Sequence, residues 1–194
     1  FALKCQEAGV DAIVAEGFEA GGHNGREETT TMVLIPQVKK AITIPLIAAG
    51  GIGYGCQMAA AFALGADAVQ IGSRFVATPE SSAHQNFKDS VVKAKEGDTV
   101  LTLKQLTPVR LIKNDFCNKV IEAEKNGASV EELTTLLGRA RAKKGMYEGD
   151  LTEGELEIGQ ISGDINEIKP AAEIVEEIIK DFNTCIKRIG NLTF

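Results

Sequence analysis

Two short segments place small residues where buried strands are expected to end. They are AAGGI at residues 48–52 and QIGSR at residues 70–74. In β/α barrels, the loops after two neighbouring strands often bind phosphate through backbone N–H groups beside a helix N-terminus. Glycine leaves room for the phosphate oxygens, and next to it Ser73 could add a hydroxyl donor and Arg74 a charge. One glycine pair could merely turn the chain, but two at consecutive strand ends favour a phosphate site.

A third segment, EGFEAGGHNG at residues 16–25, carries four glycines around His23. It follows an expected strand, so a flexible loop should expose His23 at the ligand end of the sheet. Histidine is the side chain best matched to proton transfer near neutral pH. The chain has only two histidines, and we expect a functional His23 and a structural His84. Glu16, at the strand end, could bind substrate, a cation or backbone, or have no role.

The order of elements predicts parallel βαβ units with right-handed crossovers. Short apolar runs, typical of strands buried on both faces, occupy residues 11–15, 44–49 and 67–71. Helices are expected at residues 2–8, 29–42 and 57–64. Gly9 and Gly65 should end the first and third helices, and threonine hydroxyls at 29–31 should cap the second. Pro36 inside the second helix indicates a late start or a bend.

The remaining chain has a different pattern. Residues 85–147 are expected to be a helix-rich insertion, with one helix at 130–142; residues 148–157 should be a loop, and 170–189 a final amphipathic helix. These patterns predict three parts: residues 1–84 as part of a β/α barrel, 85–158 as the insertion, and 159–194 as a return to the barrel. Three strands cannot close a barrel of eight. We therefore expect the C-terminal part of something longer, entered midway at Phe1.

Composition excludes several classes of protein. A formal charge of -6 argues against a nucleic-acid surface. No apolar stretch approaches the roughly 20 residues that cross a bilayer, and no signal peptide is recognisable at the start. The four cysteines have unrelated spacings, so neither a disulfide framework nor a metal site is expected. Reduced thiols in a cytoplasmic protein are the simplest interpretation.

The segments AEGFEAGGHNG at 15–25, AAGGI at 48–52 and VQIGSRF at 69–75 resemble the nitronate monooxygenase and enoyl-ACP reductase II family. The resemblance continues through ESSAH at 80–84 to the dipeptide GQ at 159–160, so it covers most of the chain. Members of that family are FMN-dependent TIM-type (β/α)8 barrels. The resemblance implies that the strands here are about the sixth to eighth of such a barrel, followed by a helical C-terminal region.

The resemblance also implies the site. The FMN phosphate would lie on Gly50, Gly51, Gly72 and Ser73, and His23 would lie over the flavin beside the substrate as the catalytic residue. Three further residues, expected to complete the cofactor-binding set, are Gly22, Ala49 and Gln70.

The two branches of the family share the histidine loop, so it does not separate them. The segments at 15–17, 70–75 and 80–84 resemble the reductase branch more closely, which implies NAD(P)H-dependent reduction of a trans-2-enoyl-ACP thioester in fatty-acid synthesis. The alternative is a nitronate monooxygenase that oxidises alkyl nitronates with oxygen. A third hypothesis is a non-catalytic domain that binds a phosphate ligand.

A reductase would also imply an acidic acyl-carrier-protein partner. Such a partner could dock on a cluster of basic residues, because opposite charge steers association. The cluster comprises Arg139, Arg141, Lys143 and Lys144. The competing interpretation is a solvated helix end with cations near the helix dipole. A homodimer is also left open.

Overall fold

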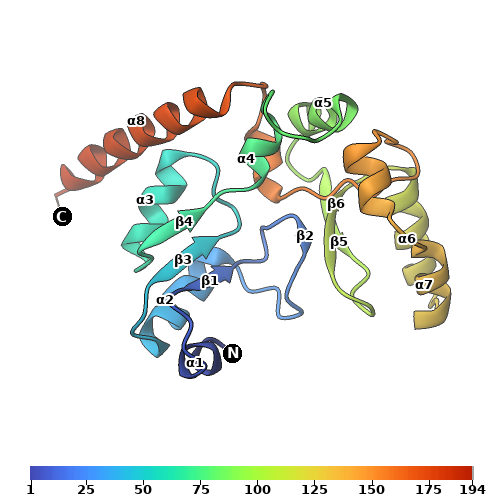
Figure 1. The fold of residues 1–194 in the computed structure, drawn as a ribbon, viewed down its shortest axis with the longest axis horizontal. Coiled ribbons are helices and arrows are strands. Elements are labelled where there is room, and N and C mark those ends of the chain that lie inside the picture. The colour runs from blue at the N-terminus through green and yellow to red at the C-terminus, as the bar shows by residue number, and fades with distance from the viewer. Residues whose placement is uncertain (194) are drawn as a thin grey trace.

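The computed structural model describes residues 1–193 and has two lobes joined by short connecting segments (Figure 1). The first lobe contains α1 (Ala2–Glu7), β1 (Ile13–Glu16), α2 (Thr31–Ala41), β3 (Leu46–Ala49), α3 (Gly55–Ala63) and β4 (Ala68–Gln70). The second contains β2 (Gly22–His23), α5 (Gln85–Lys93), β5 (Thr99–Thr102), β6 (Val109–Ile112), α6 (Asp115–Lys125), α7 (Val130–Leu137) and a π-helical turn (Lys143–Tyr147). The connecting elements are α4 (Ser73–Val76) and a 3-10 helix (Gln160–Asp164), and α8 (Ala171–Gly190) packs on α3 of the first lobe.

The first lobe is built on a parallel sheet in the order β1-β3-β4. Ala15 pairs with Ala48, and Ala48 pairs with Val69. Small and branched apolar residues fill one core beneath this sheet; its buried members are Ala15, Ile35, Ile42, Leu46, Ala48, Ile52, Ala61 and Ala66. The three predicted strands are confirmed, with their parallel pairing. Residues 1–193 form an open sheet and not a closed barrel.

In this lobe, α1 and α3 end shortly before the two glycines that were predicted to end them. Gly9 and Gly65 have positive φ of 87° and 104°, a conformation that glycine adopts at low cost. Helix α2 runs from Thr31 through Pro36 to Ala41, so a late start is wrong. Its N-terminus is capped by the Glu19 carboxylate, which accepts from the Thr31 N–H at 2.9 Å. The expected threonine caps are therefore replaced by an acidic side chain from the preceding loop.

The second lobe contains a sheet that the sequence pattern did not predict. Strands β5 and β6 form an antiparallel hairpin, and β2 pairs with the other edge of β6. The interval 85–147 is thus helix-bearing but not helical throughout. Strands of four residues give too short a pattern to separate from a loop, although TVLT and VRLI are rich in β-branched residues.

Other expectations for the second lobe need smaller corrections. Helix α7 ends at Leu137 instead of 142, because Gly138 takes a φ of 65°. The expected loop at 148–157 ends in an isolated bridge between Glu157 and Leu111. Since β2 at residues 22–23 pairs with β6 at 109–112, the proposed insertion is hydrogen-bonded to the barrel part. The boundaries at 84 and 158 stay a prediction.

Helix α8 extends along α3 at the top of the molecule (Figure 1). It runs one residue beyond the predicted end. The approach is close, since a Cβ on Gly55 would stand 2.0 Å from the Phe182 nitrogen. Phe62 and Phe182 meet edge to face with ring centroids 5.6 Å apart. Among residues 1–193, no helix has the length and apolar character needed to cross a membrane, and all four cysteines are free thiols, as expected.

Candidate functional site

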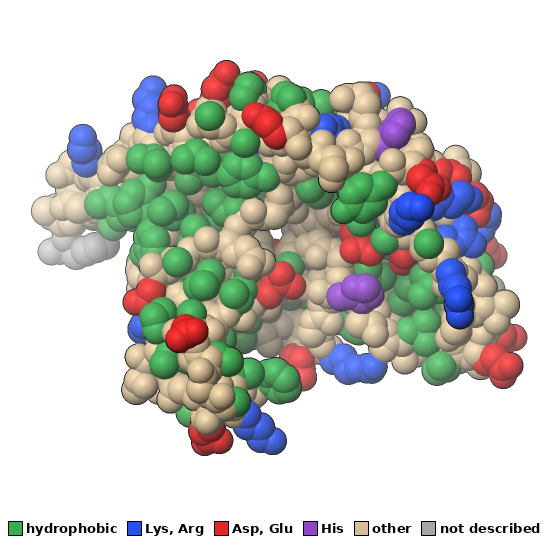
Figure 2. All heavy atoms as spheres, in the orientation of Figure 1, with side chains coloured by type: hydrophobic (Ala, Val, Ile, Leu, Met, Phe, Trp, Pro, Cys, Tyr) green, Lys and Arg blue, Asp and Glu red, His purple; other side chains and the backbone are tan. Residues whose placement is uncertain are grey.

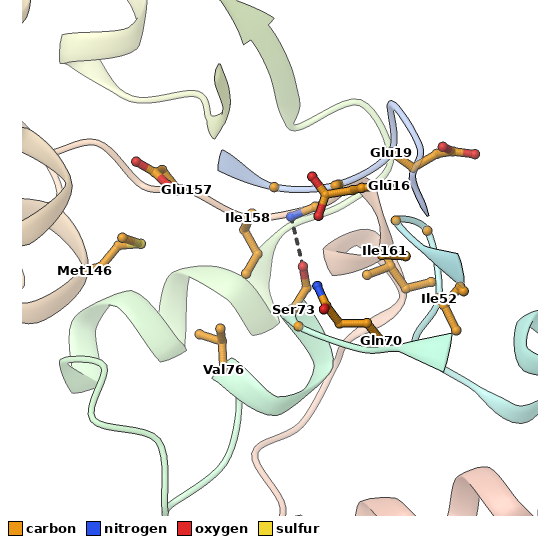
Figure 3. Close-up of a pocket in the computed structure, with 17 residues that line it drawn as sticks. Glu16, Glu19, Ile52, Gln70, Ser73, Val76, Met146, Glu157, Ile158 and Ile161 are labelled. Atoms are coloured by element: carbon orange, nitrogen blue, oxygen red, sulfur yellow. Dashed lines mark hydrogen bonds between the residues drawn. The ribbon is translucent and has the colours of Figure 1, made fainter. Parts of the chain in front are cut away.

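A cavity of about 210 Å³ lies at the carboxyl ends of β1, β3 and β4, where the second lobe meets the sheet (Figure 3). It is lined by Glu16, Glu19, Ala20, Gly21, Ala49, Gly50, Gly51, Ile52, Gln70, Gly72, Ser73, Val76, Met146, Glu157, Ile158, Gly159 and Ile161. Ligands of parallel α/β sheets characteristically bind at this edge. The volume is below the roughly 300 Å³ at which small-molecule pockets usually begin, so these residues alone do not enclose a complete site for a ligand of nucleotide size.

The first phosphate segment, AAGGI, is held in place by close backbone contacts. Gly50 and Gly51 have positive φ of 89° and 71°. A Cβ on Gly50 would stand 2.6 Å from the Gly17 carbonyl oxygen, so glycine is required there by packing alone. The Thr31 hydroxyl donates to the Gly50 carbonyl at 2.8 Å. This bend after β3 is therefore fixed before any ligand binds.

The second phosphate segment differs, because Gly72 is exposed and a Cβ there would meet nothing within 4 Å. Its φ of -105° is open to any residue, so packing does not explain the glycine. Within residues 1–193, the backbone N–H groups of Gly51, Gly72 and Ser73 donate no hydrogen bond. Free donors from two strand ends beside one open space are what a phosphate group requires.

Ser73 connects this edge to the segment that closes the cavity. Its Oγ accepts a hydrogen bond from the Gly159 N–H at 2.9 Å, drawn as the dashed line in Figure 3. The hydroxyl hydrogen therefore remains free to donate.

Arg74, predicted as a possible phosphate charge, does not line the cavity. Its side chain is 2% exposed and lies on the other side of α4, 5.9 Å from the Tyr54 ring centroid and 3.9 Å from a Glu177 oxygen. The expectation is wrong because the short helix α4 directs successive side chains to different sides. The groups that this edge offers to an anion are therefore backbone N–H groups and one hydroxyl.

The predicted residues divide into two groups. Ala49, Gly50, Gly51, Gln70, Gly72 and Ser73 lie together around the cavity. Gly22 and His23 do not line it, although the neighbouring Gly21 does. His23 is exposed and stands on β2, paired with Val109 of β6, so its backbone is part of a sheet and not of a flexible loop.

A buried arginine holds the histidine segment in place. Arg110 donates to the Phe18 carbonyl at 2.9 Å and stacks over the Phe18 ring at 4.5 Å. Burial lowers the pKa of Arg110, and the nearby Glu19 and Glu28 partly restore it.

Carboxylates line the rest of the cavity. Glu16 points toward Gln70 and Ser73 in Figure 3, and partial burial raises the pKa of the Glu16 carboxyl. Burial also raises the pKa of Glu157, on the opposite wall beside Met146. A raised pKa favours the neutral carboxyl, which donates a hydrogen bond and repels an anion less. The Glu19 carboxylate, by contrast, accepts a hydrogen bond from the Thr31 N–H.

Sequence reasoning missed most of the closing wall, which comprises Val76, Met146, Glu157, Ile158, Gly159 and Ile161. The sequence signal available for this wall was the dipeptide at residues 159–160, which is part of the family resemblance.

His84 caps α5 by accepting the Asn86 N–H through Nδ1, a structural role as expected. Among the described residues, no cluster of histidine, cysteine or carboxylate side chains could hold a metal ion.

Comparisons with known proteins agree with this geometry. The family model described as "Nitronate monooxygenase" matches residues 2–181. A Staphylococcus saprophyticus protein named "Probable nitronate monooxygenase" is 38% identical over 158 residues, covering 74% of this chain and 44% of that protein. A Staphylococcus aureus protein of the same name is 35% identical, covering 94% of this chain and 53% of its own length.

Two solved structures are also similar. FabK from Thermotoga maritima, an enoyl-ACP reductase II, superposes with a TM-score of 0.91 at 43% identity over 97% of this chain and 59% of its own. A nitroalkane oxidase from Streptomyces ansochromogenes superposes with a TM-score of 0.78 at 32% identity, over 97% of this chain and 56% of its own. This chain spans about half the length of these relatives. The family and FabK are oxidoreductases of a kind that is generally flavin-dependent. The chain belongs to the nitronate monooxygenase family.

Proposed function

We propose that the full-length protein is an FMN-dependent enoyl-thioester reductase that uses NAD(P)H. The observation that carries this proposal is the match to FabK from Thermotoga maritima. At 43% identity and a TM-score of 0.91, it is closer than the match to the nitroalkane oxidase, at 32% and 0.78. The likeness extends over nearly the whole chain, cavity included.

The residues around the cavity fit FMN. The free N–H groups of Gly51, Gly72 and Ser73 suit its phosphate. The space beside Gly72 is open, and a side chain at this position would fill it. Gln70 and Glu16 face the cavity next to this edge and offer side-chain hydrogen bonds to a polar ligand. Within residues 1–193, no lysine or arginine lines the cavity, and Arg74 is turned away toward Tyr54.

When bound, FMN supplies hydride transfer from NAD(P)H to the substrate. The chain supplies binding, orientation and proton handling. His23 does not itself line the cavity, but it follows the lining residue Gly21 closely on β2, where it can hold a proton near the substrate. Ile158 and Ile161 present apolar surface to the cavity and restrict water there.

An acyl carrier protein is the partner we propose for such a reductase. The basic cluster gives this proposal little support. Arg141 pairs with Glu153, Lys143 with Glu148 and Lys144 with Asp150, so most of its charge is neutralised. Those ion pairs favour the interpretation of a solvated helix end. Docking would then depend on other surfaces of the full-length protein.

A second candidate is a nitronate monooxygenase, favoured by the names of the curated relatives. Its substrate is an anion. The carboxylates of Glu16 and Glu157 in the cavity wall would oppose a nitronate wherever they are ionised. A neutral enoyl thioester meets no such opposition, which supports the first candidate.

The deciding experiment is anaerobic reduction of the purified full-length flavoprotein, observed through its visible flavin band. We expect NADH or NADPH to bleach the band rapidly and crotonyl thioester to restore it. A flavin that ignores both nucleotides but is bleached by an alkyl nitronate would replace the reductase with the monooxygenase. A protein that takes up no FMN would contradict both.

A further inference from the structure

His23 has an acidic neighbour from the far end of the sequence. Along one edge of β6, Val109 pairs with His23, Arg110 with Gly22 and Leu111 with Glu157. Residues 22–23 and 157 therefore follow one another along the same strand edge. The sheet brings the predicted catalytic residue next to a carboxylate of the cavity wall.

The register also sets the direction of the two side chains. Alternate residues of a strand share a face, and cross-strand partners share it too. Val109 and Leu111 are two residues apart, so their partners His23 and Glu157 project to the same side. Their Cα atoms are then about 7 Å apart at roughly 3.4 Å per residue. An imidazole and a glutamate side chain can meet across that separation by rotamer changes.

The Glu157 carboxylate lies against the backbone between the two residues. A Cβ on Gly22 would stand 2.7 Å from Oε2 of Glu157, so glycine leaves the space that the carboxylate occupies. Of the hydrogen bonds and ion pairs formed by residues 1–193, none uses the His23 imidazole or the Glu157 carboxylate. Two polar side chains without partners thus occupy neighbouring positions along one strand edge, and Glu157 also lines the cavity.

The charged groups around Glu157 favour His23 as its partner. Burial raises the pKa of the Glu157 carboxyl, and His23 lowers it. Glu155, two residues earlier, is a like charge, and Arg141 beside it is already paired with Glu153. Glu16 faces the cavity from the opposite wall. Figure 2 shows acidic side chains gathered around the hollow in the middle of this face.

We propose that Glu157 is a positioning residue for His23. Its carboxylate orients the imidazole beside the cavity and attracts a positively charged ring, because opposite charges attract strongly in a partly buried site. The reaction assigned to the ring rests on the proposed function. As the β-carbon of the enoyl thioester gains hydride, an imidazolium N–H bond breaks and a C–H bond forms at the α-carbon. The neutral ring then regains its proton from solvent.

The test uses a reagent that modifies only neutral imidazole, diethyl pyrocarbonate. It is applied to the full-length flavoprotein without substrate or nucleotide, and His23 and His84 modification is followed by peptide mass spectrometry. At pH 7, Glu157→Gln should speed modification of His23 by roughly three- to tenfold, as expected for removing one charge of a part-exposed pair. Glu157→Asp should restore most of the protection, and the rate at His84 should not change.

Turnover gives the second readout. Glu157→Gln should lower kcat with little change in KM, and Glu157→Asp should recover much of it, with the alkaline limb of the pH profile shifting only in the glutamine variant, because the proton donor must be protonated. Equal His23 modification rates in all three proteins would overturn the pairing. If the contrast appears in a protein whose flavin ignores NAD(P)H, the pairing stands and the reductase assignment fails.

Discussion

The two edges of the cavity are built in different ways. The phosphate edge comes from two strand ends one helix apart, and its donors are backbone N–H groups, with positive φ at Gly50 and Gly51 in the first of the two segments. The histidine edge combines β2, β6 and the segment around Glu157, which are distant in the sequence. The first is local and made by backbone, whereas the second is assembled by tertiary pairing and made by side chains.

This difference separates affinity from chemistry. A change at the phosphate edge should weaken flavin binding and leave the fold intact, provided that the position has open space. A change at the histidine edge should leave the flavin bound and reduce turnover. The following predictions test that division, beginning with the largest expected effect.

Replacing His23 with alanine should reduce turnover by about 100-fold or more, within the range typical of a lost general acid or base. FMN content should stay at the level of the parent protein, since His23 does not line the phosphate edge. Steady-state kinetics and the flavin absorbance measure the two effects. His84→Asn, which keeps the cap on α5, is the control. Loss of flavin in the His23 variant would break the division between the edges.

Replacing Gly72 with valine should raise the Kd for FMN by about 10- to 100-fold, if crowding costs the 1–3 kcal/mol typical of overpacking. The melting temperature of the apoprotein should stay within 2 °C or so, because a Cβ there meets nothing. Flavin titration by fluorescence quenching provides the measurement. Gly190→Ala, also in open space but away from the cavity, should change neither. Unaltered affinity in the Gly72 variant would exclude this position from the ligand site.

Replacing Arg110 with lysine should cost about 1.5–3 kcal/mol of unfolding free energy, since two bonds from a buried charged group to the Phe18 carbonyl are lost. Turnover should fall several-fold with FMN still bound. The matched control is Arg141→Lys, because Arg141 also stacks on a phenylalanine and donates to backbone carbonyls. Denaturant unfolding of both variants measures the loss of stability, and steady-state kinetics measures the loss of turnover. A similar loss of turnover in the control would show that stability alone is responsible.

The smallest predicted effect is a pH dependence of stability at Glu155. Burial, followed by the neighbouring Glu157, raises its pKa from 4.5 to about 7. The folded protein therefore holds this proton more tightly than the unfolded chain, and the resulting stabilisation is full below pH 4.5 and lost as the pH rises through 7. Glu155→Gln should raise the melting temperature by roughly 2–6 °C at pH 8 and by almost nothing at pH 4.

Glu153→Gln provides the opposite case. Lys119 and Arg141 lower the pKa of the Glu153 carboxyl, so its removal should destabilise the protein at pH 8. Scanning calorimetry of both variants at the two pH values would test the pair. A melting temperature for Glu155→Gln that does not depend on pH relative to the parent would contradict the burial of this carboxyl.

How much of the molecule could be predicted from the sequence also differs between the phosphate edge and the histidine edge. The parallel strands, the capping glycines and the phosphate edge depend on residues close in sequence, so apolar runs and glycine positions indicated them. The cap on α2 was missed because a glutamate twelve positions earlier provides it. Arg74 lies on the side of α4 that faces Glu177 of α8, a neighbour that no local pattern encodes.

The histidine edge was predicted only in part. The glycines around His23 pointed to function but also suggested a flexible loop, since a two-residue strand has no pattern of its own. Its partner β6 lies in an interval whose helical periods dominated the prediction. Glu157 could be found only through the bridge to Leu111, which tertiary structure creates.

The pairing of β2 with β6 has a consequence for how the protein folds. Strands β1, β3 and β4 meet through short crossovers, while β2 must wait for a hairpin that begins near residue 99. Contacts that close long loops form late, because the entropy of closure is lost before they stabilise anything. A refolding chain should therefore regain its capacity to quench flavin fluorescence before it regains turnover. The interval between the two signals would measure how long the phosphate edge exists without its histidine.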